Sequence, residues 1–176
     1  MPPPKTLGTA WNCQSTAERQ FIVTYTVRLH LIGVRCYYCT MHEPSFYRVS
    51  VKGIVVDTAG RFLLAREEDG RWDMMGGGLD HGESPIDGLR REIMEETGLI
   101  VTHVSATPKY FTTAQRLGHD TFVANIIYEI KLENMDFTPS DECQELRFFS
   151  VAEAWAIDTF PNVTALLDVF DPTLHG

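Results

Sequence analysis

The stretch from Gly76 to Leu99 constrains the fold of this chain more than any other part of its 176 residues. Three consecutive glycines, residues 76–78, stand shortly before a segment that is predicted to be helical from Pro85 to about Thr97. Ser84 is a good helix N-cap, proline suits the first helical position, and Gly98 suits the left-handed position that ends a helix. The sequence therefore predicts a glycine loop that leads directly into a helix with defined ends.

One face of the predicted helix carries three carboxylates. On a helical wheel of about 100° per residue, one stripe holds Glu92, Glu95 and Glu96. The adjacent stripe is apolar and is predicted to face a core; it holds Ile86, Leu89 and Ile93. Like charges at these spacings cost about 0.2–0.5 kcal/mol per pair, and the helix dipole disfavours anions in the last turn. A hard divalent cation offsets both penalties, because it prefers several oxygen ligands.

Neighbouring residues fit the same interpretation. Arg91 borders Glu95 on the wheel and could hold its carboxylate in place. The glycine loop could turn a backbone carbonyl toward the same cation, and Glu83 could reach it from just before the helix. The alternative is that the acidic stripe is only a solvated helix face, as most runs of charge are.

The spacing of these residues is similar to the Nudix box. The chain reads Gly77-x5-Glu83-x7-Arg91-Glu92-Ile93-x-Glu95-Glu96-x-Gly98-Leu99, which matches the whole box. The resemblance extends over about Tyr47–Phe170, so a Nudix domain is expected at residues 47–172. It implies an α/β fold, a Nudix-type α/β/α sandwich with a mixed sheet. Residues 1–46 lie outside the resemblance and are expected to be an N-terminal extension.

The resemblance also implies an activity and a cofactor. Nudix hydrolases use Mg²⁺ or Mn²⁺ to cleave the pyrophosphate linkage of a nucleoside diphosphate derivative by attack of water on phosphorus. A nucleotide-sanitising enzyme or a nucleoside-diphosphate-sugar hydrolase is the favoured type. The residues that correspond to the family's metal site are Gly77, through its carbonyl, Glu83, Glu92, Glu95 and Glu96. Arg91 would orient these glutamates.

The general base differs within this family, being a box glutamate such as Glu92 or Glu95, or a glutamate from a later loop. Glu142 lies where that loop is expected and is favoured here, although a solvated acidic turn is the alternative. For substrate binding, the candidate phosphate contacts are Arg48, Lys52, Arg66 and Arg116, and Phe111 is a candidate to stack on a base. A core position is the alternative for that aromatic ring.

Two other functions remain open at this point. Some Nudix-like domains bind nucleotides without cutting them, although such domains usually have an interrupted box. The same metal site could also serve a hydrolase or an isomerase that acts on a non-nucleotide diphosphate.

The net charge and the composition limit which partners and which location are expected for this protein. The formal net charge of −9 argues against coating duplex nucleic acid, so a small-molecule nucleotide is the expected partner. No run of about 18 apolar residues is present, and the start of the chain lacks the pattern of a signal peptide. Four cysteines are too few for a secreted disulfide framework, so a cytoplasmic protein is expected. A homodimer is one candidate assembly.

The first quarter of the chain gives weaker signals. Residues 21–32 alternate between apolar and polar side chains, which is typical of a strand. Cys36, Cys39 and His42 have metal-like spacing and could bind zinc with Cys13 or His30 as a fourth ligand; free thiols are the alternative. Farther along, strands are predicted at residues 47–57, 61–66, 101–104, 109–112, 121–132 and 146–149. The first two of these are predicted to form a hairpin, and helices are expected after Ser150 and over 162–170.

Overall fold

The computed structural model describes residues 45–175. In chain order the elements are β1 (Tyr47–Ile54), β2 (Phe62–Arg66), β3 (Trp72–Asp73), α1 (Pro85–Thr97), β4 (Val101–Val104), β5 (Tyr110–Gln115), β6 (Phe122–Leu132), β7 (Glu145–Phe149), α2 (Val151–Ala154), α3 (Pro161–Leu167) and the 3₁₀ turn η1 (Pro172–Leu174). The predicted strand at 21–32 and the predicted zinc ligands Cys36, Cys39 and His42 lie outside the described residues. Within residues 45–175, no helix has both the length and the apolar character needed to cross a membrane.

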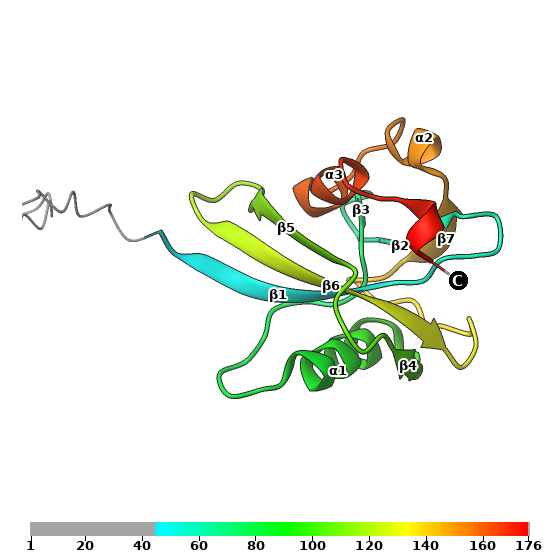
Figure 1. Cartoon of the computed structure of the whole chain (residues 1–176), viewed down its shortest axis with the longest axis horizontal. Coiled ribbons are helices and arrows are strands. Elements are labelled where there is room, and N and C mark those ends of the chain that lie inside the picture. The colour runs from blue at the N-terminus through cyan, green and yellow to red at the C-terminus, as the bar shows by residue number, and fades with distance from the viewer. Residues whose placement is uncertain (1–44, 176) are drawn as a thin grey trace, which may run out of the picture. The chain divides into compact units, whose positions relative to one another are not determined.

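The strands form two sheets. In the larger sheet, β6 pairs in parallel with β1 and antiparallel with β4 and β5. In the smaller sheet, β2 lies between β3 and β7 and is antiparallel to both. Figure 1 shows α1 on one side of the strands and α2 and α3 on the other. The predicted α/β fold with a mixed sheet is therefore confirmed.

The helices on each side of the strands cover a separate apolar core. On one side, α1 buries Leu89 and Ile93 completely, and these pack with Val51 of β1 and Ile130 of β6. On the other side, the buried residues of α3 join a cluster from both sheets, which contains Ile54, Phe62, Trp72, Phe149, Val163 and Leu166. Strand β1 thus contributes to both cores, which fixes it between the two layers.

The helix α1 has the ends that the sequence predicts. The Ser84 hydroxyl accepts a hydrogen bond from the Asp87 N–H at 3.2 Å. Gly98 adopts φ 71°, and its N–H donates to the Met94 carbonyl at 2.9 Å. A side chain other than glycine is strained at such a φ, so the helix stops here. The Ser150–Glu153 capping box that opens α2 is also present.

The predicted hairpin between the first two strands is present only next to its turn. The Asp57 N–H donates to the Arg61 carbonyl at 2.9 Å and the Leu63 N–H to the Val55 carbonyl at 3.0 Å, but the pairing does not continue, and β1 and β2 belong to different sheets. The reason is that the free edge of β1 is occupied by the glycine loop: the Val51 N–H donates to the Gly77 carbonyl and the Gly53 N–H to the Met75 carbonyl, both at 2.9 Å. This pairing brings the glycine loop against β1 and so places it beside α1.

Candidate active site

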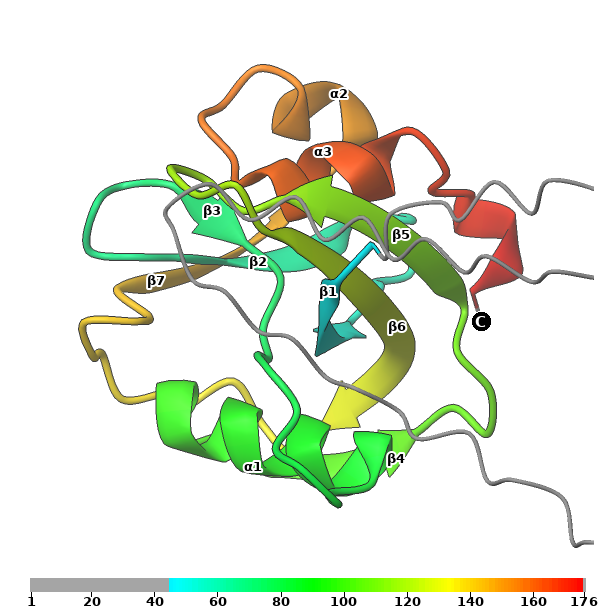
Figure 2. The same cartoon turned by 90° about the vertical axis from the view of Figure 1, so that its left-hand side faces the viewer.

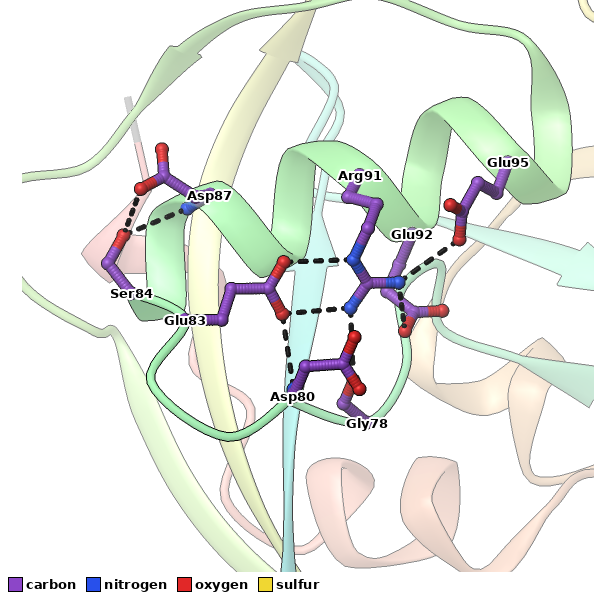
Figure 3. Close-up of polar contacts among 8 residues, drawn as sticks. All are labelled: Gly78, Asp80, Glu83, Ser84, Asp87, Arg91, Glu92 and Glu95. Atoms are coloured by element: carbon purple, nitrogen blue, oxygen red, sulfur yellow. Dashed lines mark hydrogen bonds and ion pairs between the residues drawn. The ribbon is translucent and has the colours of Figure 1, made fainter.

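Arg91 gathers the acidic side chains of the α1 region (Figure 3). Its Nε and Nη2 each donate to one oxygen of Glu83 at 2.8 Å, which is a bidentate pair. Its Nη1 donates to Glu92 Oε1 at 2.8 Å and to Glu95 Oε2 at 3.0 Å. Its Nη2 also lies 3.3 Å from the Gly78 carbonyl. One guanidinium therefore ties the helix to the segment before it and to the glycine loop.

The hydrogen bonds of Arg91 also shift the pKa values of the groups that they join. Hydrogen bonds from Arg91, followed by one from the Asp80 N–H, lower the pKa of Glu83 to about 2. The same bonds raise the pKa of Arg91 above its ordinary value, with the contribution of Glu83 the largest. Both groups are consequently ionised at any physiological pH.

Glu96 makes its contact on another side of the helix. Its Oε2 accepts a hydrogen bond from the Gly76 N–H at 2.9 Å. Gly76 has φ 102°, and a Cβ there would overlap the Val51 carbonyl oxygen, so glycine is required. Burial raises the pKa of Glu96, with further upward contributions from Glu92 and Asp73, against opposing contributions from Lys52 and the Gly76 N–H. Burial is the largest of these contributions, so the direction of the shift is set mainly by the removal of Glu96 from solvent.

Gly77 lies directly against Glu92. A Cβ on Gly77 would overlap the Glu92 carboxylate, so the absence of a side chain lets this carboxylate lie directly against the loop. The Gly77 carbonyl accepts hydrogen bonds from the Val51 N–H and from the Ser50 hydroxyl, both at 2.9 Å. Its two lone pairs are therefore used by β1, and this geometry does not support the expected role of that carbonyl as a metal ligand.

The donor set fits a hard divalent cation, although the side chains do not surround one as they stand. Within residues 45–175, no three His, Cys, Asp or Glu side chains converge closely enough to hold a metal ion. Arg91 holds Glu83, Glu92 and Glu95 instead. All candidate donors are carboxylate oxygens, which Mg²⁺ and Mn²⁺ prefer, and Glu92 and Glu96 flank the glycine loop.

A cavity of about 540 Å³ opens beside the glycine loop. Its cationic lining residues are Arg48, Lys52, Arg71 and Arg116, and its acidic ones are Glu67, Asp69 and Asp73. Gly77 and Gly78 form its border toward α1, and Phe160, Pro161 and Asn162 at the start of α3 form another wall. This volume is within the range of small-molecule sites.

Lys52 lies at this cavity as half of a buried ion pair. Its Nζ donates to Asp73 Oδ2 at 2.9 Å and to the Met74 carbonyl at 3.0 Å, and the two side chains are 8% and 10% exposed. Burial lowers the pKa of Lys52, but the carboxylates around it, with Asp73 first, outweigh burial and raise it. The pair joins β1 to β3 and therefore links the two sheets.

Three of the five predicted substrate contacts lie in the cavity wall, namely Arg48, Lys52 and Arg116. The other two do not line it. Arg66 pairs with Glu145 at 3.0 Å, and Phe111 is 66% exposed on β5. Glu142, the predicted general base, is exposed and does not line the cavity either.

Sequence reasoning missed several polar residues of the cavity, among them Glu67, Asp73 and Asn162. Burial and then Asp73 raise the pKa of Glu67 to about 7, despite the opposing charge of Lys52. Asn162 Nδ2 lies 3.4 Å from Asp73 Oδ2. Asp73 carried the one usable signal, because an acid between Trp72 and Met74 is a charge within an apolar run.

The fold and the site together define a small two-sheet α/β domain that places a carboxylate-bearing helix beside a glycine loop. The NUDIX domain family model matches residues 46–167. The chain therefore belongs to the Nudix family.

Curated relatives match over a shorter stretch. A "MutT-like protein" of Streptomyces ambofaciens is 41% identical over 74 residues, which are 42% of this chain and 48% of that protein. An "RNA pyrophosphohydrolase" of Ruthia magnifica subsp. Calyptogena magnifica is 38% identical over 74 residues, which are 40% of this chain and 41% of that protein. The chain thus spans less than half the length of these relatives.

Solved structures agree on the fold. The E. coli ORF135 protein superposes with a TM-score of 0.58 at 24% identity, covering 72% of this chain and 89% of that one. The MutT protein of Methanosarcina mazei Go1 superposes with a TM-score of 0.55 at 25% identity, covering 72% and 92%. Both similarities support the two-sheet α/β arrangement described above.

Proposed function

We propose that this protein is a metal-dependent pyrophosphohydrolase that cleaves the phosphoanhydride linkage of a nucleoside diphosphate derivative. One observation carries the proposal: Arg91 draws Glu83, Glu92 and Glu95 together along α1, at the glycine loop that borders a cavity of about 540 Å³. The names of its relatives, a MutT-like protein and RNA pyrophosphohydrolases, support the same class of reaction. A cytoplasmic location and a small-molecule substrate are part of the proposal.

Each residue of the site would have a separate role in metal binding, positioning or proton transfer. Glu92 and Glu96 would hold Mg²⁺ or Mn²⁺, with Glu83 and Glu95 as supporting carboxylates. The bound ion would shield the phosphates and lower the pKa of a water. Arg91 keeps the carboxylates on one edge of the helix. The proton of the attacking water would go to a carboxylate. Neither Glu92 nor Glu142 lines the cavity, but the Glu92 carboxylate lies against Gly77, which does.

Substrate phosphates would enter beside Gly78, where Arg48 and Arg116 line the cavity. Among the residues that the structure describes, neither arginine forms an ion pair. Lys52 is already paired with Asp73, so its charge contributes less to an incoming anion. Arg48 and Arg116 are therefore the stronger candidates for phosphate contacts.

A nucleotide panel tests the proposed function. We expect the full chain with Mg²⁺ to hydrolyse at least one of four probes: nucleoside triphosphates, ADP-ribose, UDP-sugars or a 5′-triphosphorylated RNA oligonucleotide. Released phosphate is measured directly and after adding pyrophosphatase or phosphatase. EDTA is expected to abolish turnover, and added Mg²⁺ to restore it. Binding of a nucleotide with no release of phosphate would favour the nucleotide-sensing alternative, and activity that survives EDTA would contradict the role of the metal.

Two adjacent glycines offer a separate test of how the site is arranged. Neither has a positive φ, so alanine is tolerated by the backbone itself. Gly77→Ala places a methyl group against Glu92, and we expect it to lower kcat about 10-fold or more by displacing that carboxylate. Gly78→Ala places one against the Arg48 guanidinium and is expected to raise KM about 3- to 10-fold, with a smaller effect on kcat. If both variants changed kcat and KM in the same way, the two glycines would not have the separate roles proposed here.

A further inference from the structure

His175 is buried on a stretch of chain that is otherwise exposed. Its side chain is 2% exposed, whereas residues 171–174 are exposed to solvent. Its Nδ1 lies 2.8 Å from Glu129 Oε2 on β6, and its Nε2 lies 2.8 Å from the Tyr110 hydroxyl on β5. Its ring stacks on Phe170 with centroids 5.3 Å apart. The imidazole therefore bridges two strands of the larger sheet.

Further bonds hold the same stretch, residues 171–175, which we call the strap. The Tyr110 hydroxyl accepts a hydrogen bond from the Asp171 N–H and lies 3.2 Å from the Asp171 carbonyl oxygen. Lys109 Nζ donates to the Leu174 carbonyl at 2.8 Å and lies 3.3 Å from Glu129. Figure 2 shows the strap, in red, continuing from α3 beside the sheet.

The hydrogen bonds around His175 can be satisfied in either charge state of the imidazole. Burial acts to raise the pKa of Glu129, but the bonds from His175 and Lys109 outweigh it and lower the pKa, so Glu129 accepts from Nδ1–H. With a neutral imidazole, the Tyr110 hydroxyl donates to Nε2. With a charged one, Nε2–H donates to that hydroxyl, which then donates to the Asp171 carbonyl. Both ring nitrogens therefore have a partner, and the imidazole clamps the strap to the sheet.

The strap begins a few residues after the end of α3, the helix that forms one wall of the cavity. Pro161 and Asn162 of its first turn line the cavity, and Val163 and Leu166 pack in the core that contains Tyr110. A helix of seven residues is too short to be stable alone, so it depends on what holds its ends. Fixing the chain just after α3 restricts the motion of the cavity wall.

We infer that His175 is a positioning residue that clamps the strap to β5 and β6 and thereby holds α3 in place as a wall of the cavity. The effect on α3 is independent of the proposed function, whereas the effect on substrate binding rests on it.

The test compares His175→Leu, which loses both hydrogen bonds, with His175→Asn and His175→Gln, which can each keep one. His103→Leu is the matched control, because His103 is exposed on β4. We expect backbone amides of α3 in the metal-free full chain to exchange at least about 10-fold faster in His175→Leu, with α1 unchanged. The Asn and Gln variants are expected to be intermediate. On the best substrate of the panel, KM should rise about 5-fold with kcat within about 2-fold.

Unchanged exchange in α3 would overturn the inference, and so would equal acceleration in α1 and α3, because His175 would then support the whole fold. If His175→Leu does not fold, Tyr110→Phe removes one partner of the imidazole and is expected to give the same pattern at smaller size. A wild-type chain that hydrolyses none of the probes would refute the proposed function, while hydrogen exchange would still decide the clamp. Faster exchange with an unchanged KM would overturn the link to substrate binding.

Discussion

Replacing Glu96 by Gln is expected to lower kcat at least about 100-fold while the fold is retained, because the change removes one negative charge from the proposed metal site. The side-chain oxygen of glutamine can still accept the hydrogen bond that the Gly76 N–H now donates at 2.9 Å. The glycine loop should therefore stay docked on α1. Steady-state kinetics with saturating Mg²⁺ measures the effect on turnover.

The free energy of unfolding of Glu96→Gln shows whether a loss of activity comes from loss of a metal ligand or from loss of the fold. Burial raises the pKa of Glu96 above its ordinary value of 4.5. A carboxyl whose pKa is higher in the folded chain than in the unfolded one destabilises the fold once pH exceeds the unfolded value. Without metal at pH 8, Glu96→Gln is therefore expected to unfold with a free energy no lower than that of the wild type.

Glu133→Gln is a suitable control for this substitution, because Glu133 is exposed and follows β6, away from the cavity lining. It makes the same chemical change and is expected to leave both kcat and stability near those of the wild type. Near-normal turnover in Glu96→Gln would contradict the proposed metal site. A large loss of turnover in Glu133→Gln would mean that net charge, rather than this carboxylate, governs the reaction.

Local patterns in the sequence predicted the elements that carry the acidic site. The N-cap at Ser84, the terminating Gly98 and the position of Glu92 on the helix all follow from short-range rules, and the structure agrees with the predicted bounds of α1. Such features depend on residues close together in the chain.

The remaining features depend on contacts between distant segments. The partner of β1 is β6, with Tyr47 opposite Phe122, and nothing in the alternation of residues 47–57 distinguishes that pairing from a hairpin. The same limit applies to the cavity: Asn162 reaches Asp73 across 89 positions of sequence. Nothing in the sequence indicated that Arg66, a predicted phosphate contact, pairs with Glu145, which the pairing of β2 and β7 brings alongside it.

Lys52→Met is expected to lower the free energy of unfolding by about 3–5 kcal/mol, the usual consequence of removing one partner from a buried ion pair. Asp73 is 7% exposed and would lose its cationic partner, with the Met74 N–H at 2.8 Å and the Asn162 amide at 3.4 Å as its remaining partners. Neither supplies a full positive charge. Urea denaturation at neutral pH measures the loss.

The exposed pair of Arg61 and Asp57 provides the matched control. Its nitrogen–oxygen distance of 2.8 Å is close to the 2.9 Å of the buried pair, but the Arg61 side chain is 48% exposed. Arg61→Met is expected to cost less than about 1 kcal/mol, because solvent screens such pairs. A loss below that level in Lys52→Met as well would show that water in the cavity solvates Asp73.

A double variant tests whether the cost comes from the unpaired charge. Lys52→Met combined with Asp73→Asn removes both charges and keeps the volume of the second side chain, so it should recover most of the lost stability. The recovery is expected to be unaffected by salt, since buried charges are screened far less than exposed ones. If the double variant is as unstable as Lys52→Met, the lysine stabilises the chain by packing its aliphatic stem between the two sheets rather than by its charge.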